Sequence, residues 1–192
     1  MRIARLLVFG LSAGLPEVAL AHTGHGGAGS LVGGLVHPLS GTDHVLAMVA
    51  VGLLAAHLGG RSIVALPLAF MGMMLIGGTV AAGALPLAGV ELGILASVLV
   101  LGLLIASGRS LPGTVALCLC ALFALFHGHA HGAEMPAAAS GAVYALGFLA
   151  ATGSLHALGI ALGSVLGRFA PAAAMRCAGA VIVLGGVGLA IG

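Results

Sequence analysis

The stretch His37-Pro38-Leu39-Ser40-Gly41-Thr42-Asp43-His44 places two imidazoles and a carboxylate within eight residues. It lies inside an otherwise apolar run that extends from Leu31 to Leu58. Polar side chains are costly in such a run, and ionisable groups at membrane depth usually mark a functional site. Imidazole and carboxylate groups together are ligands for divalent transition metals. The stretch therefore predicts a metal-binding site inside a membrane-embedded helix.

The composition supports a membrane environment. Hydrophobic residues make up 61% of the 192 residues, whereas only 5% are charged. A soluble domain carries about 25% charged residues, so the alternative of a very apolar soluble core does not fit, and a lipid bilayer is the expected partner. The formal charge is only +2, and there is no basic patch. Nothing in the chain therefore indicates binding to nucleic acid.

Residues 1–21 have the pattern of a secretory signal peptide. Two arginines form the charged start, a short apolar middle follows, and Ala19-Leu20-Ala21 is a small-x-small cleavage site. The alternative is an uncleaved first helix, which the short apolar run disfavours because a span needs about 20 residues.

Cleavage after Ala21 would start the mature chain with a flexible, His- and Gly-rich segment at 22–29. His22 and His25 would then stand beside a free α-amine, and amine plus imidazole nitrogen is a donor set for Ni(II) or Cu(II). The alternative is a solvated linker that happens to contain two histidines, because short His-rich tracts are only compositional evidence.

Six hydrophobic segments follow the predicted signal peptide. Their approximate bounds are 30–58, 63–86, 90–107, 112–132, 138–166 and 174–191. Each is near the length of about 20 residues that crosses a bilayer, and Pro38 with Gly41 should loosen the outer part of the first helix. Residues 30–192 are therefore expected to form one all-α integral membrane domain with six transmembrane helices. Three spans in each half would make the two halves inverted relative to each other.

The charges predict an orientation for these spans. A cleaved signal peptide would leave residue 22 in the periplasm, and alternation of the spans then puts three loops in the cytoplasm. Those loops carry every arginine of the predicted mature chain: Arg61, Arg109, Arg168 and Arg176. This distribution follows the positive-inside rule, and it predicts a multi-pass protein of the inner membrane with a periplasmic N-terminus.

The first helix carries three candidate ligands. His37 and His44 are seven residues apart, close to two full turns, and would lie on nearly one face of a continuous helix. Asp43 would point about 100° away around the helix. It could bind the metal directly or orient an imidazole of another helix, and the spacing leaves both roles open.

The fourth segment ends in a second histidine-rich stretch. His127 and His131 are four residues apart and share a face, Glu134 can join them, and His129 points elsewhere. We interpret these side chains as ligands that run inward from the outer mouth. The alternative is a polar helix end at the membrane interface.

The fifth segment places His156 inside the membrane, with Thr152 and Ser154 nearby. It is a candidate ligand from a third helix. The alternative is a hydrogen bond between helices, which is common among polar residues in membranes.

The motifs HPLSGTDHVLAMVAVG at 37–52 and FHGHAHGAE at 126–134 resemble those of the HupE/UreJ family of nickel and cobalt permeases, and the likeness covers essentially the whole mature chain. The resemblance implies secondary uptake of Ni²⁺, or of Co²⁺ in some members, for the maturation of hydrogenase or urease. It implies that the metal is transported and that no cofactor is permanently bound. It carries over these metal-handling residues: His37, Asp43, His44, His127, His129, His131 and Glu134.

Two other classes of function remain open from the residues alone. One is a membrane metalloenzyme, although no obvious general base accompanies a metal-bound water. The other is a metal sensor that does not transport, although the chain has no segment that looks like an output domain. We expect a permease and not an enzyme. The choice between nickel and cobalt, the energy coupling and the presence of a homo-oligomer stay undecided at this stage.

Overall fold

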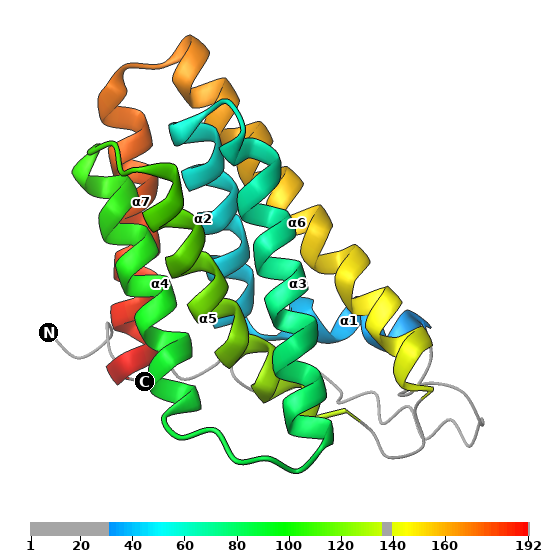
Figure 1. Cartoon of the computed structure of the whole chain (residues 1–192). Helices are drawn as coiled ribbons and strands as arrows, with labels where there is room; N and C mark the ends of the chain where they lie inside the picture. Colours follow the sequence, from blue (N-terminus) through cyan, green and yellow to red (C-terminus); the bar gives the residue numbers. More distant parts are fainter. Residues whose placement is uncertain (1–30, 136–139, 192) are drawn as a thin grey trace, which may run out of the picture.

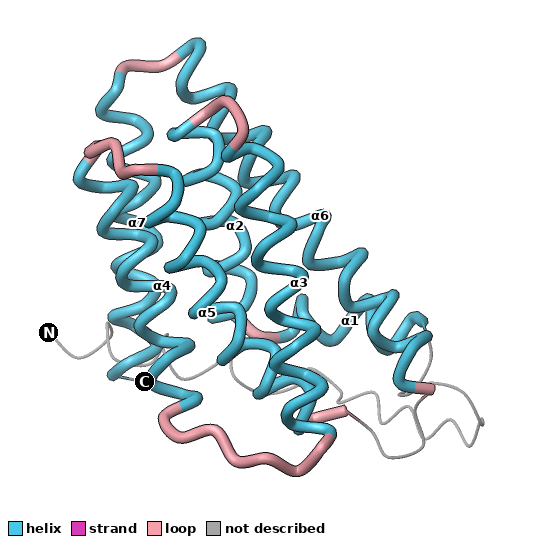
Figure 2. The backbone as a smooth tube through the Cα atoms, viewed as in Figure 1, coloured by secondary structure: helices cyan, strands magenta, loops and turns pink. Residues whose placement is uncertain are grey.

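The computed structural model describes residues 31–135 and 140–191, and within these ranges it contains helices and no strand (Figure 2). The helices are α1 (Leu31–Ser40), α2 (Thr42–Leu58), α3 (Ser62–Ala82), α4 (Val90–Ser107), α5 (Gly113–Ala133), α6 (Gly141–Phe169) and α7 (Ala172–Ile191). The predicted signal peptide at 1–21 and the segment 22–29, with His22 and His25, lie outside the described residues.

Five of the helices, α3 to α7, are each long and apolar enough to cross a membrane. The pair α1 and α2 passes the same test only as one broken span, which would make six. Successive helices from α2 onward run in alternating directions along the bundle (Figure 1). The all-α prediction is confirmed for the described residues, and the chain is a multi-pass membrane protein.

The helix bounds follow the predicted segments closely, with one early stop. The third predicted segment, 90–107, coincides with α4. The second, predicted to reach residue 86, ends at Ala82, because the backbone turns at Ala84, whose φ is 55°. The amide of Leu85 then donates to the carbonyl of Val80, a bond that closes many helix ends.

The predicted span over 30–58 is divided into two helices, at the place where Pro38 and Gly41 were expected to loosen it. The chain breaks at Gly41, and α1 and α2 meet at an angle of 88°. Pro38 lies in the last turn of α1, where it cannot donate a backbone hydrogen bond, and Gly41 has extended φ and ψ angles of −91° and 114°. A new helix starts there, with the amide of Val45 donating to the carbonyl of Gly41 at 3.0 Å. His37 and His44 therefore do not share a helix face.

Three helix pairs form the most extensive contacts: α3 with α5, α2 with α6, and α4 with α7. Each pair approaches through glycine. A Cβ atom at Gly77 of α3 would collide with the backbone of α5, one at Gly159 of α6 with the backbone of α2, and one at Gly179 of α7 with the backbone of α4. Small residues let membrane helices pack backbone to backbone, so these pairs form the rigid frame that holds the polar side chains.

The α4–α7 pair gives a direct test of this packing. We expect Gly179→Ala to destabilise the protein by about 1–3 kcal/mol, because the added methyl must push α7 away from α4. Gly188→Ala, on the same helix, should leave stability unchanged, since nothing lies within 4 Å of a Cβ there. Thermal unfolding of the purified variants in detergent measures the difference. Equal midpoints would show that α7 is not held by this contact.

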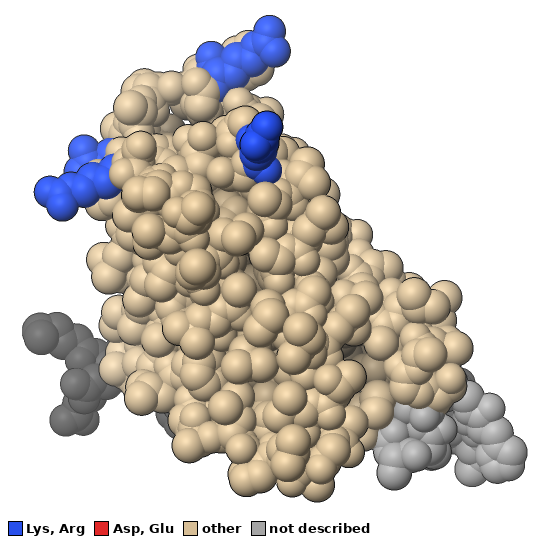
Figure 3. All heavy atoms as spheres, viewed as in Figure 1, with Lys and Arg blue, Asp and Glu red and all other residues tan. Residues whose placement is uncertain are grey.

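The arginines of the described residues gather at one end of the bundle (Figure 3). Arg61 lies between α2 and α3, and Arg109 between α4 and α5. Arg168 lies near the end of α6, and Arg176 in α7 donates to the carbonyl of Ala106 at 2.9 Å. All four are exposed, so the bundle has one basic end and one end where the histidine-rich stretch of α5 terminates.

Candidate metal centre

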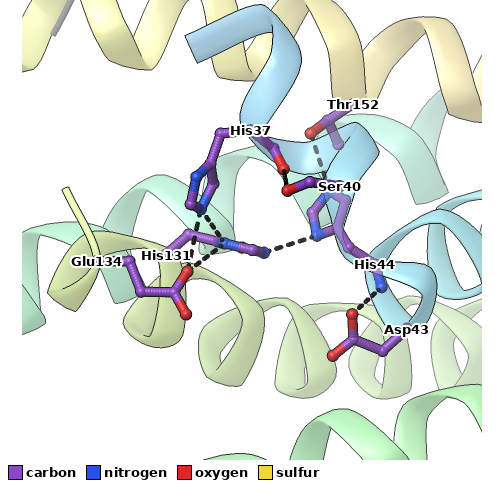
Figure 4. Close-up of polar contacts among 7 residues, drawn as sticks. All are labelled: His37, Ser40, Asp43, His44, His131, Glu134 and Thr152. Carbon is purple, nitrogen blue, oxygen red and sulfur yellow. Dashed lines mark hydrogen bonds and ion pairs between the residues drawn. The ribbon is translucent and has the colours of Figure 1, made fainter. Parts of the chain in front are cut away.

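The bend between α1 and α2 brings histidines from both helices to the end of α5 (Figure 4). His37 lies in the last turn of α1, and His131 in the last turn of α5. His44 lies near the start of α2. His131 contacts both of the others through different ring nitrogens: its Nδ1 is 3.0 Å from Nε2 of His37, and its Nε2 is 3.1 Å from Nδ1 of His44. Three helices therefore supply a continuous row of imidazoles.

One end of this row, which we name the exposed group, consists of His37, His131 and Glu134. Oε2 of Glu134 is 3.0 Å from Nε2 of His37 and 3.1 Å from Nδ1 of His131. The side chain of Glu134 is 56% exposed, that of His37 29%, and that of His131 15%. The group therefore opens to its surroundings on the carboxylate side.

The other end, which we name the buried group, consists of His44, His127 and His131. His44 is 0% exposed and His127 is 1% exposed, and their ring centroids are 5.4 Å apart. One ligand atom from each of the three histidines lies within 4.8 Å of the other two. His131 is thus a member of both groups.

The donor atoms of both groups fit a divalent transition metal. Two ligands that each bind a metal at about 2.1 Å lie about 3.0–3.4 Å apart, which is close to the separations in the exposed group. The exposed group offers two imidazoles and a carboxylate, and the buried group offers three imidazoles. Such nitrogen-rich sets suit nickel, cobalt and zinc better than magnesium or calcium.

Asp43, one of the predicted ligands, lies outside both groups. Figure 4 shows its carboxylate turned away from the imidazole row, with Oδ1 accepting the backbone N–H of His44 at 2.7 Å. This contact within the first turn of α2 is neither of the two roles that the sequence left open for Asp43, a direct ligand or a partner of an imidazole on another helix.

His129 also lies outside both groups. Its Nε2–H donates to the carbonyl of Leu85, 2.9 Å away, in the loop between α3 and α4. The sequence predicted that His129 points away from the face shared by His127 and His131, and this direction is what the structure shows. Its inclusion among the metal-handling residues rests on the resemblance alone.

His156 lies apart from both groups. It is 1% exposed, and neither ring nitrogen has a hydrogen-bond partner among the described residues. Its ring contacts that of Phe70 at a centroid distance of 5.5 Å. Thr152, one turn earlier on α6, lies 3.3 Å from Nε2 of His44. The interhelical hydrogen bond weighed for His156 is therefore made by Thr152 instead.

Sequence reasoning missed two residues at the site. Phe148 packs its ring against His131 and His44, at centroid distances of 4.8 and 5.3 Å. Its spacing of four residues from Thr152 and eight from His156 places all three on one face of α6, so helical periodicity could have found it. Ser97 contacts His127 from α4. A lone serine in an apolar helix carries no such signal.

A cavity of about 230 Å³ between α3, α5 and α6 reaches His131 from the side. Its walls include Met74, Leu75 and Leu149, and they are almost entirely apolar. Such walls offer an ion no replacement for its hydration shell, so the polar row, and not this cavity, is the suitable route for a cation.

Comparison with known proteins identifies the family of the chain. Residues 10–189 match the family described as HupE / UreJ protein. Protein HupE of Rhizobium leguminosarum bv. viciae is 44% identical over 178 residues, which cover 93% of this chain and 93% of that protein. No solved structure matches the chain significantly. A match over nearly the full length, with this identity, settles the relationship: the chain belongs to the HupE/UreJ family.

Proposed function

We propose that this protein is a secondary transporter that takes up Ni²⁺ or Co²⁺ across the inner membrane for the maturation of hydrogenase or urease. The family is associated with nickel and cobalt uptake for these enzymes. The donor atoms do not decide between the two metals, because both accept the same nitrogen and oxygen ligands.

One observation carries the proposal: His131 belongs to both an exposed and a buried group of ligands. Side-chain exposure falls along the row, from 56% at Glu134 to 15% at His131, and His44 is 0% exposed as a whole residue. An ion bound first beside Glu134 can exchange ligands at His131 without leaving the row. A single closed site would serve storage or structure, whereas successive sites of decreasing exposure serve transport.

The cation would shed water in steps along this row. His22 and His25 would collect it, His37, His131 and Glu134 would bind it first, and His44 with His127 would take it deeper. His156 would follow as the next imidazole. Asp43 would add negative charge beside His44, and His129 would hold the loop at the mouth through Leu85.

Membrane potential is the proposed driving force. It is worth about 4.6 kcal/mol for two charges that cross 100 mV. The sequence contains no nucleotide-binding loop that would allow direct use of ATP. The basic end of the bundle would face the cytoplasm, and the exposed group the periplasm.

The helix pairing also supports the proposed inverted halves. Suppose that the helices of one half, α2, α3 and α4, correspond in order to those of the other half, α5, α6 and α7. Replacing each helix by its counterpart then turns the α2–α6 contact into the α5–α3 contact. It also maps the α4–α7 pair onto itself. This is the pairing that a two-fold axis in the membrane plane would produce.

Flux in proteoliposomes tests the proposal. Purified protein is reconstituted, a potassium gradient with valinomycin makes the interior negative, and radioactive nickel is added outside. We expect uptake that saturates with nickel and increases with the potential, and none in vesicles that carry His44→Ala together with His127→Ala. Binding without flux would contradict transport and favour a sensor. A bound-iron spectrum without flux would favour an enzyme.

A further inference from the structure

We propose that Ser97 is a positioning residue that fixes the tautomer of His127, so that Nδ1 carries the free lone pair in the buried group. Ser97 lies in α4, a helix that contributes no side chain to either ligand group among the described residues. The use of that lone pair to bind the cation rests on the proposed function. The tautomer itself does not.

The hydrogen bonds of Ser97 settle the direction of the contact. Its Oγ lies 2.6 Å from the carbonyl oxygen of Ile94 and 2.9 Å from Nε2 of His127. A hydroxyl has one hydrogen, and a carbonyl oxygen can only accept. The hydrogen therefore goes to Ile94, and Oγ can only accept from His127. Nε2 of His127 must carry the N–H.

This bond leaves the other nitrogen of His127 as a bare acceptor. A neutral imidazole has one N–H and one lone pair, and the hydrogen bond made by one nitrogen decides the role of the other. Nδ1 of His127 is buried, and it has no hydrogen-bond partner among the described residues. Leaving an acceptor unpaired there is costly, and a bound cation would satisfy it. The pattern matches metal sites, where the second ring nitrogen is held by an outer partner.

A bond that only holds α4 against α5 would fix the same tautomer, so the tautomer tests the geometry of the contact, and nickel binding separates the two interpretations. The test uses protein with ¹⁵N-labelled histidine, without metal, and the His127 signals are identified by their loss in His127→Gln. We expect the Nε2–H tautomer in the wild type and in Ser97→Thr, and loss of this preference in Ser97→Ala. A wild-type His127 that is protonated on Nδ1, or on both nitrogens, would overturn the proposal even if Ser97→Ala does not fold.

Nickel binding to the same variants gives the second readout. We expect Ser97→Ala to weaken nickel binding about 10- to 100-fold, the usual effect of losing a residue that holds a ligand, and Ser97→Thr to restore it. Ser154→Ala is the matched control, because Ser154 also donates to a backbone carbonyl, that of Ala150 at 2.8 Å, but is exposed. Unchanged affinity in Ser97→Ala would contradict the proposal. If the wild type shows the Nε2–H tautomer but neither binds nor transports nickel, the proposed function fails and the positioning role stands.

Discussion

Replacing His131 with glutamine should lower the initial rate of nickel uptake by at least about 100-fold, the upper limit for losing a residue that only supports a ligand. His131 is the one described residue that belongs to both ligand groups. Its Nδ1 faces His37 and Glu134, whereas its Nε2 faces His44. Glutamine has similar reach but a single acceptor oxygen, so it cannot face both groups with a ligand atom. Uptake of radioactive nickel by cells at matched expression measures the effect.

His129→Gln provides the control for this prediction. His129 lies two residues earlier on α5, but its side chain bonds to the carbonyl of Leu85 outside both groups. The glutamine amide can still donate to that carbonyl, so uptake should stay close to the wild-type rate. If both variants lose uptake equally, the loss reflects damage to the end of α5. If neither does, the row of imidazoles is not the route of the ion.

The histidines that the structure brings together could be singled out from the sequence as candidate ligands, but their arrangement could not be predicted. A polar residue inside an apolar run is visible without a structure, because the bilayer makes it costly, and His37, His44, His127 and His131 were found in this way. Helical spacing placed His37 and His44 on one face. The break at Gly41 instead lets them approach His131 from opposite sides, and this depends on a bend that the spacing does not encode.

For the helices, too, the bounds set by the local sequence could be predicted, whereas contacts between helices could not. The bounds 90–107 of α4 could be predicted because α4 is almost entirely apolar and a glycine stands at each end, Gly89 and Gly108, both of which have positive φ in the structure. The contact between Ser97 and His127 could not be predicted, because it joins two different helices. The spacing of residues along one helix does not show which residue of another helix lies beside it.

We expect binding of the cation to require the negative charges of two carboxylates beside the imidazole row, those of Glu134 and Asp43. Imidazoles bind a metal in the neutral form, so a divalent cation brings two uncompensated charges into a region that excludes water. Glu134 contacts two ligands of the exposed group, and Asp43 is adjacent to His44. Attraction between unit charges 4 Å apart is about 1 kcal/mol in water and about 4 kcal/mol near a protein surface, and a half-exposed group lies between these limits.

We therefore expect Glu134→Gln and Asp43→Asn each to raise the half-saturating nickel concentration about 10- to 100-fold, and the double variant to show no measurable uptake. The amides keep the size of the side chain and one acceptor oxygen, so Asp43→Asn can still accept the N–H of His44. Asp43→Ala removes this acceptor together with the charge. Wild-type uptake in Asp43→Asn with none in Asp43→Ala would contradict the charge argument for Asp43. In that case the role of Asp43 would be to hold the first turn of α2, and Glu134 would be the carboxylate that neutralises the ion.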